Sequence, residues 1–157
     1  MAGNFKDAID AIKNSSKSSS VYIGADSQRY RTKDGGYKAR YSAVIVLHID
    51  SSRGGVIFHE TMEIPDYGRK TESLVPRLLQ ETEFAIEAYE AVKDVLGDRH
   101  VEIHLDINTK DEYASSVAVS QALGYVKGVT GQDAFVKPNS WAAGHAADHA
   151  VRHMNQQ

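Results

Sequence analysis

Three aspartates occupy positions where strands and helices could bring their carboxylates together. Asp26 and Asp106 each follow a run rich in apolar residues, so each is expected to end a buried strand. Asp148 lies in a C-terminal segment, residues 140–154, whose alanine-rich pattern predicts a helix. Two carboxylates at strand ends and one on a helix can converge on one point. Converging carboxylates suit a hard divalent cation, and such a cation can promote phosphodiester hydrolysis.

Each aspartate also has an ordinary structural interpretation. Asp26 could simply end a strand, and Asp106 could form an Asx turn, because Asn108 follows it closely. Asp148 could face solvent and pair with Arg152 one helical turn later. The three aspartates in this order along the chain favour the functional interpretation more than any one of them does alone.

The order of the predicted elements decides whether these carboxylates can meet. The first half predicts an antiparallel meander of three strands, because apolar runs alternate with glycine-containing turn signals. The resulting β-β-β-α-β-α-β-α order implies an α/β fold with a mixed five-stranded sheet and helices on its faces. The elements expected in the second half are a long helix over residues 71–96, a strand over 101–107, a helix over 112–123 that ends at Gly124, a short strand near 134–136 and the helix over 140–154.

The N-terminal residues are expected to stand outside this domain. Residues 4–13 predict a short amphipathic helix, and the serine-rich residues 14–20 predict a flexible connector. A single domain is then expected over residues 21–157, which is long enough to bury a hydrophobic core.

The element order is that of the ribonuclease H-like fold, and four sequence blocks narrow the resemblance. From about residue 21 onward, the chain resembles the bacterial and phage family of predicted ribonuclease H-like nucleases, the YkuK-like or DUF458 family. The last block is the most specific part of the match. The blocks are residues 21–28, 104–108, 124–128 and 137–148.

This resemblance implies a metal-dependent nuclease and assigns roles to the aspartates. Asp26, Asp106 and Asp148 fall at the positions of the family's metal ligands, and Asp26 would be the shared ligand. Two Mg²⁺ or Mn²⁺ ions about 4 Å apart would then bridge a phosphate oxygen. One ion would activate water, and the other would stabilise the leaving 3′ oxygen.

The resemblance also implies a fourth carboxylate on the first long helix. Glu81 borders the apolar stripe of that helix, whereas Glu83 points about 160° away from Ala85 around the helix axis. We therefore favour Glu81 as the fourth catalytic acid. A surface glutamate on a charged helix is the equally good alternative.

His145 is a further candidate catalytic residue, because it lies one helical turn before Asp148 on the predicted helix. A neutral imidazole there could move a proton or bind a softer metal. A zinc site from His145 and His149 has suitable spacing but lacks the intervening glutamate of a metalloprotease. The chain has seven histidines, so a coincidental position is the alternative.

A basic segment follows Asp26 directly and is a candidate nucleic-acid binding surface. Its centre predicts a hairpin turn, and tyrosines are interleaved with the basic residues. By strand alternation Arg29, Arg31 and Lys33 share one face, where they could contact phosphates while the rings stack on bases. A soluble hairpin whose charges protect a sheet edge is the alternative. The basic residues are Arg29, Arg31, Lys33, Lys38 and Arg40.

Composition limits the function classes. The chain has no cysteine, which excludes disulfides, thiolate zinc sites and cysteine nucleophiles. A net charge of −3 argues against a protein that coats nucleic acid by bulk electrostatics. We see no signal peptide and no run of about 18 apolar residues, so the cytoplasm is the expected location.

The sequence leaves the activity open between two main hypotheses. The first is a nuclease acting on nucleic acid, with RNA, DNA and hybrid all possible substrates. The second is a non-catalytic module that binds nucleic acid through residues 29–40. A phosphatase or small-nucleotide hydrolase that uses the same carboxylates is a weaker third possibility.

Overall fold

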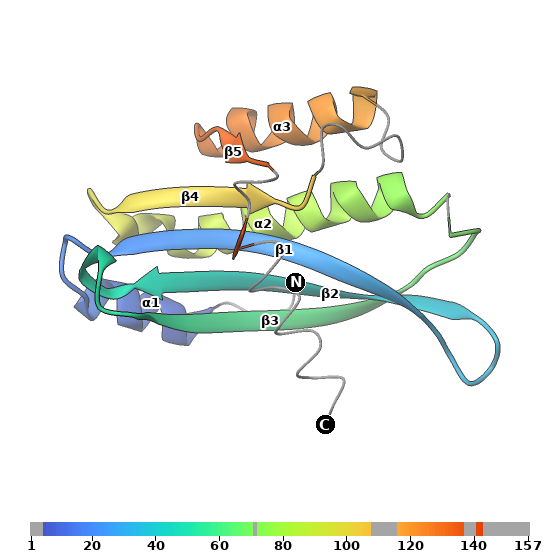
Figure 1. Ribbon diagram of the computed structural model, residues 1–157, viewed down its shortest axis with the longest axis horizontal. Helices are drawn as coiled ribbons and strands as arrows, with labels where there is room; N and C mark the ends of the chain where they lie inside the picture. The colour runs from blue at the N-terminus through green and yellow to red at the C-terminus, as the bar shows by residue number, and fades with distance from the viewer. Residues whose placement is uncertain (1–4, 71, 108–115, 137–140, 143–157) are drawn as a thin grey trace.

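The protein is built on a five-stranded mixed sheet with the strand order β3-β2-β1-β4-β5 (Figure 1). The computed structural model describes residues 5–70, 72–107, 116–136 and 141–142. The first three strands form an antiparallel meander, and β4 and β5 continue the sheet in parallel with β1. The predicted fold class is therefore confirmed. The strands are β1 (Ser20–Arg31), β2 (Tyr37–His48), β3 (Gly55–Pro65), β4 (His100–Leu105) and β5 (Ala134–Phe135).

Helices cover one face of the sheet, which we call the helix-covered face. Helices α1 and α2 pack on it, and α3 packs against α2 beside β5 (Figure 1). Ile23 and Ile45 belong to the large core on this face, whereas Val44 and Val46 form a separate buried cluster on the opposite face. No helix in the described part of the chain has the length and apolar character needed to cross a membrane. The helices are α1 (Lys6–Asn14), α2 (Leu74–Leu96), α3 (Ser116–Thr130) and the short 3₁₀ turn η1 (Ile49–Ser51).

Local sequence explains the boundaries of α2, the helix that carries the predicted fourth acid. Pro76 lies in its first turn, where the missing N–H costs nothing. The helix ends before Gly97, whose φ of +55° favours glycine. Its buried side runs from Leu78 to Leu96 and lies against β1, β2 and β4. This packing fixes which of its glutamates faces the sheet.

Two predicted boundaries are wrong. β1 does not end at Asp26 but continues to Arg31, because its last residues still pair with β2. The helix predicted to end at Gly124 instead runs to Thr130, and the described part of it begins at Ser116. Continuing the helix buries Val126 completely, and this packing outweighs the weak stop signal of an exposed glycine. Of the predicted helix over residues 140–154, only the helical residues 141–142 are described.

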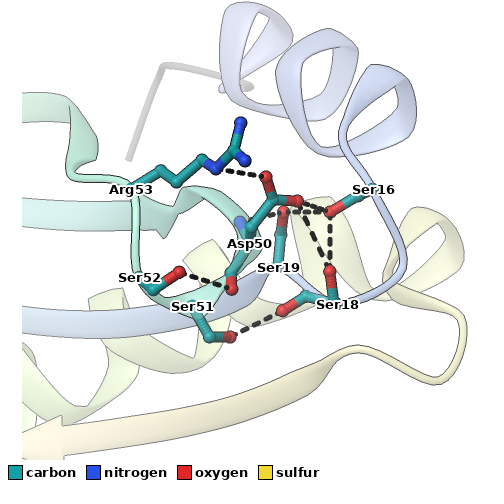
Figure 2. Close-up of polar contacts among 7 residues, drawn as sticks. All are labelled: Ser16, Ser18, Ser19, Asp50, Ser51, Ser52 and Arg53. Atoms are coloured by element: carbon teal, nitrogen blue, oxygen red, sulfur yellow. Dashed lines mark hydrogen bonds and ion pairs between the residues drawn. The ribbon is translucent and has the colours of Figure 1, made fainter.

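The serine-rich connector before β1 is held in place by the turn between β2 and β3 (Figure 2). Asp50 and Ser51 have φ values of +53° and +57°, the left-handed region that non-glycine residues rarely adopt. The Asp50 carboxylate accepts hydrogen bonds from the hydroxyls of Ser16 and Ser18, and the Asp50 N–H donates to Ser19 Oγ at 3.1 Å. Ser51 Oγ donates to the Ser18 carbonyl at 2.6 Å. These bonds stabilise the strained turn and join the connector to it, whereas the sequence predicted a flexible connector.

Candidate functional site

Asp26 and Asp106 lie side by side on the two central strands. β1 and β4 run parallel in a register that pairs Ala25 with Leu105, and the two aspartates are the next residues along each strand path. Neighbouring strands are about 4.8 Å apart, so the two carboxylates emerge close together. Asp26 Oδ1 accepts a hydrogen bond from the backbone N–H of Ser27 at 2.8 Å. Both residues are partly exposed, although Asp106 Oδ1 is itself buried.

Glu81 brings a third carboxylate to this point from α2. It is only 8% exposed, and its Oε1 accepts a hydrogen bond of 2.5 Å from Ser27 Oγ. Burial, and then the negative charge of Asp26, raise the pKa of Glu81 well above its usual value, and the charge of Asp106 adds to the effect. The hydrogen bond from Ser27 and the charge of Arg77 act in the other direction. The charges of Asp26 and Asp106 therefore both act on the Glu81 carboxylate.

Arg77 and Ser27 belong to the same site, although the sequence analysis did not single them out. Arg77 lies one helical turn before Glu81, and its Nη1 donates to Ser27 Oγ at 3.5 Å. Nearby, burial and then the charge of Glu81 raise the pKa of Tyr41 to about 12. Arg77 could have been predicted from the sequence, because residues four apart on a helix are neighbours and Arg77 precedes Glu81 by four. Ser27 could have been found from alternation, which turns it toward α2 when its neighbour Asp26 points the other way.

The cluster matches a divalent metal ion in donor type and charge. Carboxylate oxygens are the ligands that Mg²⁺ and Mn²⁺ prefer, and a cation would relieve the repulsion that raises the pKa of Glu81. Within residues 5–70, 72–107, 116–136 and 141–142, no three His, Asp or Glu side chains lie close enough together to hold a metal ion. The remaining predicted ligand, Asp148, lies outside the described residues, as do His145 and His149.

Glu83, the rejected alternative to Glu81, lies on another side of α2. It is exposed and helps to line a groove of about 370 Å³ between α2 and α3. Of the predicted site residues that the structure describes, none lines this groove. The structure thus separates the two glutamates as helical periodicity predicted.

The opposite face of the sheet carries a buried histidine beside the aspartates. His104 is fully buried, and its Nδ1 accepts a hydrogen bond from the backbone N–H of Ala142 at 3.1 Å. Its Nε2 lies 2.9 Å from Glu102 Oε1. Burial lowers the pKa of His104, and the hydrogen bond to Glu102 opposes this shift. Trp141 and Ala142 cover this part of the face, which explains how a strand with such polar side chains can be central.

The five basic residues of the β1–β2 hairpin do not form one surface. In the hairpin register Gln28 pairs with Arg40 and Tyr30 with Lys38. Directly paired residues share a face, so Lys38 and Arg40 lie on the face opposite to Arg29 and Arg31. Lys33 lies in the turn beyond the end of β1. The alternation that joined Arg29, Arg31 and Lys33 therefore holds only for the two arginines.

Two of these arginines already have partners within the protein. Arg29 Nε lies 2.7 Å from Asp66 Oδ2, in a pair whose side chains are each 11% exposed, and the guanidinium stacks 3.8 Å above the Tyr37 ring. Arg40 pairs with Glu63, and the hydrogen bond from Arg40 lowers the pKa of that carboxyl. Arg31 and Lys33 are exposed.

Comparison with known proteins agrees with this architecture. A family model described as ribonuclease H-like matches residues 4–152. Searches of curated proteins and of solved structures each returned no match. The family match covers nearly the whole chain, and the strand order and the paired aspartates of β1 and β4 are consistent with it. On this evidence the chain belongs to the ribonuclease H-like family.

Proposed function

We propose that the protein is a metal-dependent nuclease that hydrolyses phosphodiester bonds of nucleic acid. The observation that carries the proposal is the burial of Glu81 against the charges of Asp26 and Asp106. Burying one carboxylate beside two others is costly for stability alone, so such a cluster favours a functional role. Membership of the ribonuclease H-like family supports the same role.

We assign the roles of the residues from the resemblance and from the contacts of those that the structure describes. Asp26 neighbours Asp106 across the β1–β4 pairing, and its charge raises the pKa of Glu81, so it would be the shared metal ligand, with Asp106 and Asp148 as the flanking ligands. Ser27 holds Glu81 by a hydrogen bond and so limits how that carboxylate can turn. His145 remains the proposed proton carrier. Mg²⁺ or Mn²⁺, expected as two ions, would supply Lewis acidity at the phosphate and a lowered pKa for water.

Nucleic acid is the proposed partner, and the exposed cations of the hairpin are its proposed contacts. β1 and β2 continue beyond the end of β4 (Figure 1). Because Asp106 directly follows β4, the hairpin extends past the aspartates. Arg31 and Lys33 are exposed there, and within the described part of the chain neither forms an ion pair with an acidic side chain. Phosphate contacts of this kind would position a strand without reading its sequence.

Calorimetric titration with Mn²⁺ tests the proposal directly. Asp26→Asn and Glu81→Gln should each weaken or abolish binding, whereas Glu83→Gln, a change on the same helix but away from the cluster, should leave binding unchanged. Cleavage of single-stranded, duplex and hybrid substrates should likewise be weakened or abolished in Asp26→Asn and Glu81→Gln and unchanged in Glu83→Gln. An Asp26→Asn variant that cleaves nucleic acid as fast as the wild-type protein would contradict the proposal.

A non-catalytic nucleic-acid binding module is the second candidate. It is favoured by the exposed cations Arg31 and Lys33. It predicts salt-sensitive binding that Asp26→Asn leaves intact, with no cleavage in Mg²⁺ or Mn²⁺.

A further inference from the structure

We propose that His104 is a positioning residue that ties the start of the C-terminal segment to β4 beside Asp106. Ala142, the backbone group it holds, precedes the proposed metal ligand Asp148 by six residues in the chain. The effect on the metal site rests on the proposed function, whereas the tie itself can be tested without it.

Two hydrogen bonds determine the protonation state of the ring. His104 Nδ1 accepts from the Ala142 N–H, so this nitrogen carries no proton. Nε2 therefore carries the proton of a neutral imidazole and donates it to Glu102 Oε1 at 2.9 Å. Glu102 is held in turn by His100, whose Nε2 lies 2.5 Å from Glu102 Oε2. The ring is thus fixed in one tautomer and one orientation.

Aromatic packing holds the ring from several sides. The His104 ring centroid lies 5.3 Å from that of Trp141, 5.5 Å from that of Phe135 and 5.8 Å from that of Tyr22. Trp141 also packs on Tyr22 with centroids 4.7 Å apart. Residues from β1, β4, β5 and the C-terminal segment therefore meet at one buried imidazole.

The bond to Ala142 satisfies a donor that its own helix would leave open. The first four N–H groups of a helix have no partner within that helix, and the sequence predicts a helix from residue 140. A side chain from β4 fills this role for Ala142. A histidine that served only to fill the core would not need an acceptor atom at this position.

Chain lengths show why the tie matters for the carboxylates. His104 and Asp106 are two residues apart, which is about 7 Å along an extended strand. Six residues from Ala142 to Asp148 span about 9 Å as a helix but can reach about 20 Å when extended. Fixing Ala142 beside β4 therefore limits how far the proposed ligand can lie from the other carboxylates.

Two amide substitutions separate the roles of the two ring nitrogens. The His104→Asn side chain keeps an acceptor near the Nδ1 position, and His104→Gln keeps a polar group near the Nε2 position only. If His104 positions Ala142, His104→Asn should preserve the tie and His104→Gln should lose it. Unfolding curves for both variants allow the comparison at equal fractions of folded protein.

The first readout is independent of metal and substrate. Imidazole ¹⁵N chemical shifts of the wild-type protein should show the Nε2–H tautomer for His104, which requires no variant. Hydrogen exchange of the Ala142 amide should be slow in the wild type and in His104→Asn and fast in His104→Gln. A protonated Nδ1, or an Ala142 amide equally protected in His104→Gln, would overturn the tie.

The second readout tests the effect on the metal site. Mn²⁺ affinity should fall about tenfold or more in His104→Gln and change little in His104→Asn, as for other residues that orient a ligand indirectly. An Ala142 amide released in His104→Gln with unchanged Mn²⁺ affinity would overturn the positioning role and leave the nuclease proposal standing. Wild-type protein that neither binds Mn²⁺ nor cleaves would overturn the proposed function and the positioning role together, and the exchange data would still decide the tie.

Discussion

At the scale of single residues, Glu81 shows how the site is held in an unfavourable electrostatic state. The side chain is almost fully buried, the charges of Asp26 and Asp106 raise its pKa, and Ser27 and Arg77 compensate for this only in part. A protein that kept this cluster for stability alone would gain by replacing one acid with a neutral residue.

The raised pKa of Glu81 predicts how stability depends on pH. Between the ordinary value of 4.5 and the higher folded-state pKa, the native state binds more protons than the unfolded state. The contribution of Glu81 to stability is therefore full below pH 4.5 and is lost as the pH rises through the folded-state pKa. In metal-free protein, Glu81→Gln should remove this loss and raise the free energy of unfolding at pH 8. Denaturant unfolding at several pH values measures this free energy. A Glu81→Gln variant that is less stable than the wild type at pH 8 would contradict the raised pKa of Glu81.

Helical periodicity was enough to select Glu81 over Glu83, because the side of a helix that faces the core can be read from apolar spacing. It could not identify His104 as a tether. That role depends on a contact with Ala142, 38 residues away, and no local pattern marks such a contact.

At the scale of elements, the β1–β2 hairpin shows what strand alternation can and cannot tell. The turn and the meander were readable from glycine positions and apolar runs. The register, which pairs Tyr30 with Lys38, divides the basic residues between two faces, and it is set by pairing along the whole length of both strands. The sequence therefore suggested one binding surface where the structure has two.

The two arginines on the same face of β1 should respond differently to substitution. Arg29→Ala should lower the free energy of unfolding by about 1–3 kcal/mol, because it leaves the partly buried Asp66 without its charged donor. Arg31 is exposed, so Arg31→Ala should cost less than about 0.5 kcal/mol and should instead reduce the salt dependence of nucleic-acid binding. Urea unfolding measures the stability of the two variants, and nucleic-acid binding at several salt concentrations measures the salt dependence. Equal losses of stability in the two variants would contradict this prediction.

Helix α3 contains two glycines, and the sequence predicted that the helix would end at the first of them, Gly124. An added Cβ at Gly124 or Gly128 meets no atom of the described residues within 4 Å, so Gly124→Ala and Gly128→Ala should each stabilise the protein by about 0.5–1 kcal/mol. Gly131 is the matched control: its φ of +75° should make Gly131→Ala destabilising by about 1–2 kcal/mol. Thermal unfolding of the three variants gives the signs, and destabilisation by the first two would show that α3 needs those glycines.

At the scale of the whole molecule, the predicted order of strands and helices is confirmed as far as β5, because most of the apolar runs are long and are bounded by clear turn signals. The boundaries were less accurate, since β1 gains residues by pairing with β2 and α3 gains residues by packing. Family membership accounts for the arrangement, whereas the metal and the substrate depend on the few side chains around Asp26.

Metal binding should be visible in global stability. Mn²⁺ at 100 times its dissociation constant should add about 2.7 kcal/mol to the free energy of unfolding, because it binds only the folded site. For a chain of this length that corresponds to a rise of roughly 5–10 °C in Tm. Asp26→Asn should remove the rise and Glu83→Gln should keep it in a thermal scan. An equal rise in all three proteins would indicate metal binding elsewhere.

The packing of Trp141 gives the protein an intrinsic optical probe. It is the only tryptophan in the chain, and its ring lies against His104 and Tyr22 at the point where the C-terminal segment meets β4. Its emission should therefore shift when that segment leaves the sheet, without any label or engineered residue. Stopped-flow fluorescence could then time the arrival of the segment during refolding and show whether it joins the sheet before or after the strands have paired.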